Sequence, residues 1–115
     1  MPLVKIDTSA QLTVEIKQQI VAELSKLVAQ TIGKPEQYVM VTIAPAQIML
    51  SACSEPAVFA DVRSIGGLTS AVNGELCKGI CDIFKRHAAI PAERVYANFT
   101  EIAPANWGWR SSTFG

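Results

Sequence analysis

The chain has 115 residues, half of them hydrophobic and only 17% charged, and its ten basic and ten acidic side chains cancel. This length is typical of a single domain over residues 1–115, and the composition excludes a disordered segment. A balanced charge argues against a phosphate-binding face, so we expect no nucleic-acid partner.

The hydropathy of the chain bears on its partners. Every apolar stretch is broken by polar or charged side chains before the roughly 20 residues that a bilayer requires, so we expect no membrane partner. A mean hydropathy of +0.26 is high for a small chain, because a small domain leaves much of its surface outside the core. We therefore expect a homo-oligomer.

The cysteines and the start of the chain indicate a compartment. The chain has three cysteines, Cys53, Cys77 and Cys81. This is an odd number and too few for a disulfide scaffold. Cys77 and Cys81 would be neighbours on a helix, but with one histidine in the chain they are expected to pack in the core and hold no metal. The first residues are not followed by an apolar signal-peptide region, so the cytoplasm is the expected location.

The first half of the chain predicts a strand, a helix and a second strand. Residues 2–7 alternate in polarity and end at turn residues, as a short strand does. Thr13 is a suitable N-cap for the helix that follows. Gly33 suits the left-handed residue that ends it, and a proline comes two residues later. Residues 38–43 are rich in β-formers and predict the second strand, and a connection over 44–56 has a short extra strand around Ile48.

The second half predicts the same order of elements. Residues 57–63 are expected to form a strand, a helix begins at about Thr69, and residues 95–100 form the last strand. The apolar face of this helix consists of Val72, Leu76, Ile80, Ile83 and Phe84. Its last turn carries Lys85, Arg86 and His87, which suits the negative end of a helix dipole, so His87 is interpreted as a helix-end cation.

The two halves form a repeat. A shift of 56 residues places Thr13 on Thr69 and Pro35 on Pro91. Two β-α-β units with right-handed crossovers can join into one four-stranded mixed sheet with both helices on one face, an α/β fold that some schemes call α+β. The other face is expected to be apolar and to need a second subunit.

Pro2 is the first candidate for chemistry. When the residue after Met1 is small, the initiator methionine is usually removed, which would leave Pro2 with a free secondary amine. Burial lowers the pKa of an amine and could make it a general base near neutral pH. The alternative is a proline at the first residue of a strand, where proline is tolerated.

Five separated segments form a set that runs from end to end of the chain. They are Met1-Pro2, Gly33-Lys34-Pro35 with Tyr38, Ser64-Ile65-Gly66, Arg94-Val95-Tyr96-Ala97-Asn98 and Asn106-Trp107-Gly108-Trp109-Arg110-Ser111-Ser112-Thr113-Phe114. Together they resemble the macrophage migration inhibitory factor family of the tautomerase superfamily. The resemblance implies two β-α-β units assembled as a homotrimer. It also implies cofactor-free keto–enol tautomerisation of phenylpyruvate-like α-keto acids, with the N-terminal proline as the acid and base.

The resemblance also implies roles for individual residues. Pro2 matches the catalytic base, and Lys34 matches the lysine that binds the substrate carboxylate; its alternative is a cation at a helix end. Ile65 matches the position whose backbone N–H contacts the same carboxylate, with an ordinary core residue as the alternative. Tyr96 and Asn98 match residues that the neighbouring subunit contributes, with interface packing and a strand-end hydrogen bond as their alternatives.

The departures from the family pattern bear on activity. Trp107 stands where the best-known members have a small aliphatic residue, which leaves the substrate range open. Trp107 and Trp109 either line a pocket for an aromatic substrate or pack at a subunit contact. Residues 57–60 lack the Cys-x-x-Cys of members with thiol chemistry, which argues against that activity. The resemblance leaves two other functions open. One is a cytokine-like protein that binds a receptor, has a vestigial pocket and leaves the cell by non-classical secretion. The other is a decarboxylase or dehalogenase, which would need further Arg or Asp groups in the pocket.

Overall fold

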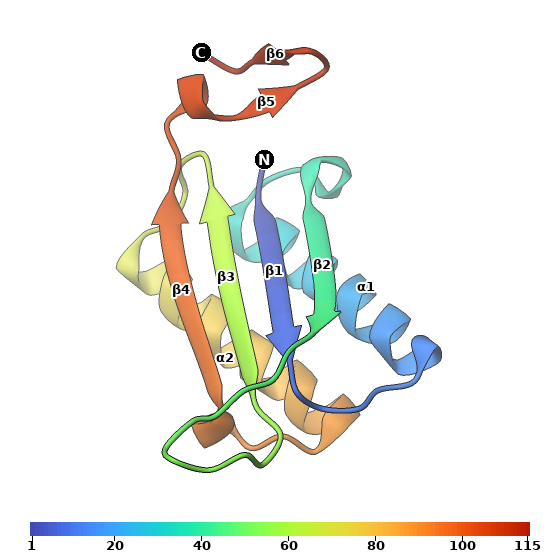
Figure 1. Ribbon diagram of the computed structural model, residues 1–115. Coiled ribbons are helices and arrows are strands. Elements are labelled where there is room, and N and C mark those ends of the chain that lie inside the picture. The colour runs from blue at the N-terminus through green and yellow to red at the C-terminus, as the bar shows by residue number, and fades with distance from the viewer.

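The computed structural model describes residues 1–115 and consists of two β-α-β units followed by a small hairpin (Figure 1). The first unit contains β1 (Leu3–Thr8), α1 (Val14–Ile32) and β2 (Met40–Pro45). The second contains β3 (Val58–Ser64), α2 (Ser70–Ala88) and β4 (Val95–Glu101). The hairpin is formed by β5 (Gly108–Trp109) and β6 (Ser112–Thr113).

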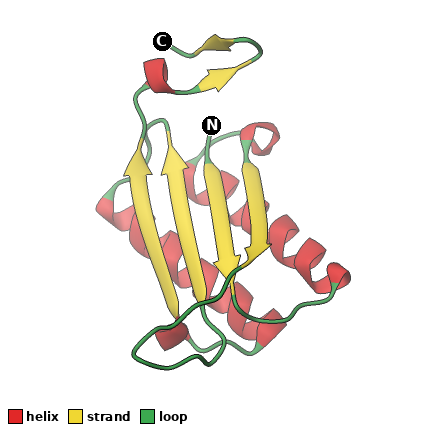
Figure 2. Ribbon diagram, in the orientation of Figure 1, coloured by secondary structure: helices red, strands yellow, loops and turns green.

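The four long strands form one mixed sheet in the order β2-β1-β3-β4. Within each unit the two strands are parallel, as a helical crossover requires, and the units join through the antiparallel pair β1–β3. Both helices cover the same face of the sheet (Figure 2). The predicted α/β fold with a four-stranded mixed sheet and two helices on one face is therefore confirmed.

The repeat of 56 residues extends to both ends of the helices. Thr13 and Thr69 each cap a helix by accepting a hydrogen bond of 3.2 Å from the backbone N–H three residues on. Gly33 ends α1 in the left-handed conformation (φ 80°), and the residue 56 positions later, Ala89, ends α2 in the same conformation (φ 54°). Neither helix combines the length and the apolar composition that crossing a bilayer would require.

The core lies between the sheet and the helices. Alternate residues of the two central strands point toward the helices and are almost fully buried: Val4, Ile6, Val58, Ala60 and Val62. They meet the apolar faces of α1 and α2, which contribute Ile20, Leu24, Val28, Leu76, Ile80 and Phe84. The helices approach closely at Gly79, where an added Cβ would lie 2.6 Å from the δ carbons of Leu27.

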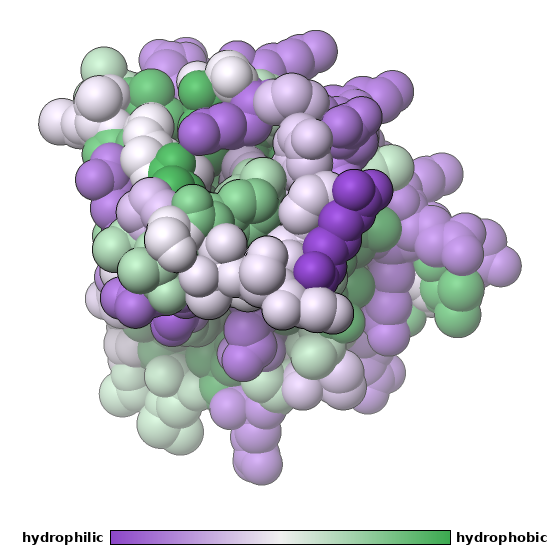
Figure 3. Space-filling view, turned by 90° about the horizontal axis from the view of Figure 1, so that it is seen from above, coloured by the Kyte–Doolittle hydropathy of each residue, from purple (hydrophilic) through white to green (hydrophobic).

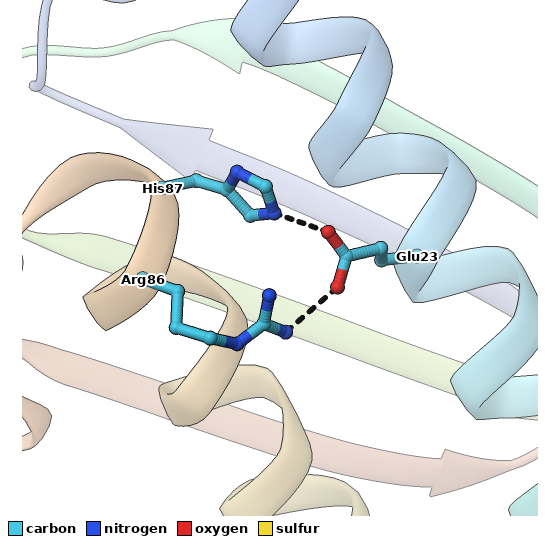
Figure 4. Close-up of polar contacts among 3 residues, drawn as sticks. All are labelled: Glu23, Arg86 and His87. Atoms are coloured by element: carbon cyan, nitrogen blue, oxygen red, sulfur yellow. Dashed lines mark hydrogen bonds and ion pairs between the residues drawn. The ribbon is translucent and has the colours of Figure 1, made fainter.

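The two helices are also joined by a polar cluster (Figure 4). Glu23 of α1 accepts hydrogen bonds from Arg86, at 2.7 Å, and from His87 in the last turn of α2. Arg86 first and His87 second hold the pKa of Glu23 below its ordinary value. His87 thus has a partner on the other helix in addition to its place at a helix end.

The uncovered face of the sheet differs from the prediction. Its side chains are Leu3, Lys5, Asp7, Met40, Thr42, Ala44, Phe59, Asp61, Arg63, Tyr96, Asn98 and Thr100. The expectation of an apolar face is wrong, because strand alternation turns most apolar side chains toward the helices. The exposed large apolar side chains are divided: Met40 and Tyr96 lie on this face, whereas Met49, 73% exposed, and Trp109, 45% exposed, lie in a loop and in the C-terminal segment.

Two local expectations also need correction. The connection between β2 and β3 has no strand around Ile48. It contains a single bridge between Leu50 and Cys53, closed by two left-handed residues. Arg94 holds this connection by donating to backbone carbonyl oxygens, among them that of Leu50 at 2.7 Å. The second strand begins at Met40, two residues later than predicted, because a 3₁₀ turn occupies the preceding residues.

Candidate active site

Pro2 directly precedes β1, at the end of the molecule where both termini of the chain lie (Figure 1). Its side chain is almost fully buried at the start of β1, and its carbonyl oxygen accepts a 3.0 Å hydrogen bond from the N–H of Met40. It borders a pocket of about 440 Å³, the lining of which is mostly apolar and includes Met1, Tyr38, Met40, Trp107 and Trp109. An apolar pocket with a few polar groups is the usual form of a small-molecule site.

Aromatic rings form one wall of this pocket. Tyr38 meets Trp109 edge to face, with 5.6 Å between ring centroids. Trp109 in turn stacks on Phe114 at 5.9 Å, and the Arg110 guanidinium lies 4.4 Å from the centroid of the Trp109 ring. The contact with Tyr38 holds the C-terminal hairpin against the 3₁₀ turn before β2, and the other two order the segment itself. Figure 3 looks down on this end and shows apolar and near-neutral residues over much of it, with hydrophilic side chains mainly around the margin.

Lys34 and Ile65 come together at the same end of the molecule. The left-handed Gly33 turns the chain out of α1, and Lys34 Nζ then donates to the carbonyl oxygen of Ile65 at 3.1 Å. The pKa of the Met1 amino group is lowered, first by burial and second by the positive charge of Lys34. The contact that the structure shows uses the Ile65 carbonyl, whereas the expected carboxylate contact uses its N–H.

Tyr96 and Asn98 lie elsewhere in the same chain. They are exposed on the uncovered face of β4, where the register sets Tyr96 beside Phe59, and Phe59 beside Asp7. Tyr96 is therefore level with Asp7, five residues along β1 from Pro2. Asn98 is level with Lys5, three residues from Pro2 at about 3.3 Å per residue. Within one chain, neither Tyr96 nor Asn98 lines the pocket.

Comparison with known proteins identifies the family. A family model described as macrophage migration inhibitory factor (MIF) matches residues 1–115. The chain is 33% identical to a macrophage migration inhibitory factor of Rattus norvegicus over 115 residues, which cover 99% of each chain. It is 38% identical to that of Xenopus tropicalis over 96 residues, covering 83% and 84%. The chain belongs to the macrophage migration inhibitory factor family.

Solved structures agree with this assignment. The crystal structure of a macrophage migration inhibitory factor-like protein from Entamoeba histolytica matches with a TM-score of 0.95 and 33% identity, covering 98% of each chain. A homologue from Prochlorococcus marinus matches with a TM-score of 0.92 and 32% identity, covering 98% of this chain and 99% of that one. MIF-family membership places the chain in the tautomerase superfamily and supports tautomerase activity in general.

The structure of this MIF-family chain adds pocket residues that sequence reasoning did not single out. Tyr38 belongs to one of the five segments of the resemblance but was given no role there, and Met40 belongs to none of them. Both line the pocket beside Pro2. Trp107 lines the pocket within one chain, which is one of its two expected roles. It also borders a second hollow of about 290 Å³ that reaches Arg63 on the uncovered face.

The cysteines lie outside the pocket. All three are free thiols, and none is among the residues that line it. Cys81 packs against the hydrophobic core from α2. Burial first, and the neighbouring Cys77 second, raise the pKa of its thiol. These contacts agree with the expected role of Cys81 in packing.

Proposed function

We propose that this MIF-family chain is a cofactor-free keto–enol tautomerase of phenylpyruvate-like α-keto acids, with the nitrogen of Pro2 as general acid and base. The observation that carries the proposal is the position of Pro2. It is buried at the edge of an apolar, aromatic-walled pocket, and the lysine ammonium that perturbs the N-terminus lies at the same end of the chain.

The surroundings of the N-terminus suit a base that works near neutral pH. Removal of Met1 would free the secondary amine of Pro2. Burial and the Lys34 charge already lower the pKa of the Met1 amine, and the same two causes would act on the Pro2 nitrogen. A pyrrolidine nitrogen is otherwise too basic to be neutral at pH 7, so a lowered pKa makes the free base available.

The substrate is held by its carboxylate. In the proposal, Lys34 Nζ and the Ile65 N–H bind that group, while the aromatic ring lies against Tyr38 and Trp107. This placement sets the carbon beside the carbonyl next to Pro2, which supplies orientation. The Pro2 nitrogen takes a proton from that carbon, the electron pair of the C–H bond forms the enol double bond, and the proton is returned to the carbonyl oxygen.

A neighbouring subunit completes the site in this proposal. Tyr96 and Asn98 are exposed and, within one chain, do not line the pocket. A homotrimer in which each pocket takes these two residues from the adjacent subunit would use them. The family assignment supports self-association of this kind.

A second candidate function is cytokine-like binding to a receptor, with a vestigial pocket. The relatives of this chain are called macrophage migration inhibitory factor, which favours this candidate. It would require that the protein reach a receptor outside the cell. Loss of receptor binding without loss of tautomerase activity in a surface variant would separate the two functions.

The test of the proposed function is to block the Pro2 nitrogen. Mass spectrometry first establishes that Met1 is absent from the purified protein. One alanine placed before Pro2 then converts its amine into an amide, which has no basicity, and should abolish phenylpyruvate tautomerisation. The control carries the same alanine after Gly115. Full activity in the protein extended before Pro2 would contradict the role of Pro2.

A further inference from the structure

Ser64 has a buried hydroxyl without a partner. The side chain lies at the end of β3 and is 0% exposed, yet its Oγ makes no hydrogen bond within the chain. Buried hydroxyls are almost always hydrogen-bonded, because losing water without replacement is costly. A partner for Ser64 Oγ is therefore to be sought in the functional form of the protein.

The register of the sheet places this hydroxyl beside Pro2. Leu3 of β1 is opposite Arg63 of the antiparallel strand β3, so the next pair along these strands is Pro2 and Ser64. Both side chains are buried on the face that the helices cover. Residues directly opposite on antiparallel strands have Cβ atoms about 4.5–5.5 Å apart. The Pro2 nitrogen belongs to the same five-membered ring as its Cβ, so the register places the ring that carries this nitrogen next to the Ser64 side chain.

Three polar side chains close to Ser64 in the register or in sequence have other partners. Glu101, opposite Ser64 on β4, accepts a hydrogen bond from the N–H of Leu68 at 3.1 Å. Lys34 Nζ donates to the backbone carbonyl oxygen of Ile65, 3.1 Å away. Arg63 projects from the uncovered face and pairs with an aspartate there. None of these groups bonds to Ser64 Oγ.

We propose that Ser64 Oγ accepts a hydrogen bond from the protonated nitrogen of Pro2 and is a positioning residue for it, an inference that rests on the proposed function. A protonated secondary amine has two N–H bonds. With one of them directed to Ser64 on the buried side, the other stays directed into the pocket. That second proton is the one exchanged with the substrate, so Ser64 fixes the direction of proton transfer.

The proposal has a measurable consequence for the titration of Pro2. A hydrogen bond to the charged form of an amine favours that form and raises its pKa. Ser64→Ala removes the acceptor, so the acid limb of the kcat/KM profile should move to lower pH by about one unit or more. A role confined to packing would change stability and leave the limb where it is. Tyr38, which lines the pocket, and Lys34, whose charge acts on the N-terminus, are present in every variant.

A matched control is available on β1. Thr8 is a buried hydroxyl residue at the far end of the strand, and its Oγ1 already donates to the carbonyl oxygen of Ala57 at 2.9 Å. Thr8→Val should lower the thermal unfolding midpoint and leave the pH profile unchanged. Comparison of the two variants separates loss of a buried hydroxyl from loss of the contact with Pro2.

The experiment measures the titration directly as well as through turnover. Protein labelled with ¹⁵N-proline and shown by mass spectrometry to lack Met1 is titrated by NMR. Only the N-terminal one of the six prolines has a titratable nitrogen. A lower Pro2 pKa in Ser64→Ala, unchanged in Thr8→Val, supports the proposal. Equal pKa values in wild type and Ser64→Ala overturn it. If Ser64→Ala lowers the Pro2 pKa but the wild-type protein does not turn over phenylpyruvate, the contact between Ser64 and Pro2 is supported and only the proposed function is refuted.

Discussion

At the scale of single residues, Lys34 has two alternative roles, stabilisation of the end of α1 and binding of the substrate carboxylate. As a cation at the end of α1 it would stabilise the helix dipole. The repeat argues that the fold does not require a lysine here. The residue 56 positions later is Ile90, which follows the left-handed end of α2 and is 1% exposed. The second unit therefore fills the equivalent position with a buried apolar side chain.

Lys34→Ala should selectively weaken the use of substrates that carry a carboxylate. A charge-assisted hydrogen bond contributes about 1.5–3 kcal/mol, so kcat/KM for phenylpyruvate should fall roughly ten- to 150-fold. A carboxylate-free ester of the same substrate should be almost indifferent to this change. Lys26→Ala removes an exposed cation from the middle of α1 and is the control. Equal losses on acid and ester would show that Lys34 only supports the structure.

At the scale of elements, the helices are held by more than their apolar faces. Glu23 links α1 to both Arg86 and His87 in the last turn of α2 (Figure 4). The side chain of Glu23 is 37% exposed, so solvent screens these pairs and limits their contribution to stability. The cluster nevertheless lowers the pKa of Glu23, which makes its contribution dependent on pH.

Glu23→Gln should destabilise the protein at neutral pH and have no effect in acid. The pKa of Glu23 is lower in the folded than in the unfolded chain. Its stabilisation is therefore complete above the ordinary glutamate value of about 4.3 and is lost as the pH falls through the folded value. Thermal unfolding at a series of pH values should show a difference of a few degrees at pH 7 that begins to shrink below the ordinary glutamate value and vanishes once the pH is below the folded value.

Glu75→Gln is the matched control for this prediction. Glu75 is exposed on α2 and has no ion-pair partner among the residues of the chain. Its replacement should leave the unfolding midpoint nearly unchanged at every pH. A difference between Glu23→Gln and wild type that persists undiminished at pH 3 would show that the effect comes from packing and not from the carboxylate charge.

At the scale of the whole molecule, the case for assembly rests on the site more than on the sheet. The uncovered face carries several charged side chains, so burial of an apolar face does not by itself require a partner. The separation of Tyr96 and Asn98 from Pro2 along the sheet does require one, if all three act in one pocket.

Mixing inactive variants tests a trimer with shared sites. Light scattering should give a mass three times the 12.4 kDa of one chain. Chains with alanine before Pro2 and chains with Asn98→Ala should each have low activity. Unfolded together and refolded in equal amounts, they should regain activity in about a quarter of the sites, because some pockets combine an intact Pro2 with a neighbour's intact Asn98.

The control for this mixing experiment alters two residues, Pro2 and Lys34, that the same subunit contributes to a pocket. Chains extended before Pro2 and chains with Lys34→Ala should not complement each other, since every mixed pocket still lacks one of the two groups. Equal recovery in both mixtures would contradict the division of the site between subunits. A stable monomer in light scattering would contradict assembly altogether.

The sequence by itself determined the elements that depend on neighbouring residues. The caps at Thr13 and Thr69 and the left-handed turn at Gly33 were predictable, because capping involves residues within one helical turn. The repeat of 56 residues predicted the two β-α-β units, since parallel strands need a crossover. Pro2, Lys34 and Ile65 could be proposed together only through the family resemblance, because no local spacing relates them.

The tertiary structure decided the rest, through the antiparallel pairing of β1 with β3. That register sets Tyr96 five residues along the sheet from Pro2 and leaves the hydroxyl of Ser64 buried opposite Pro2. It also turns Arg63 and its neighbours to a face that composition alone suggested would be apolar. Strand register and burial arise from contacts between residues far apart in the chain, and local patterns do not encode them.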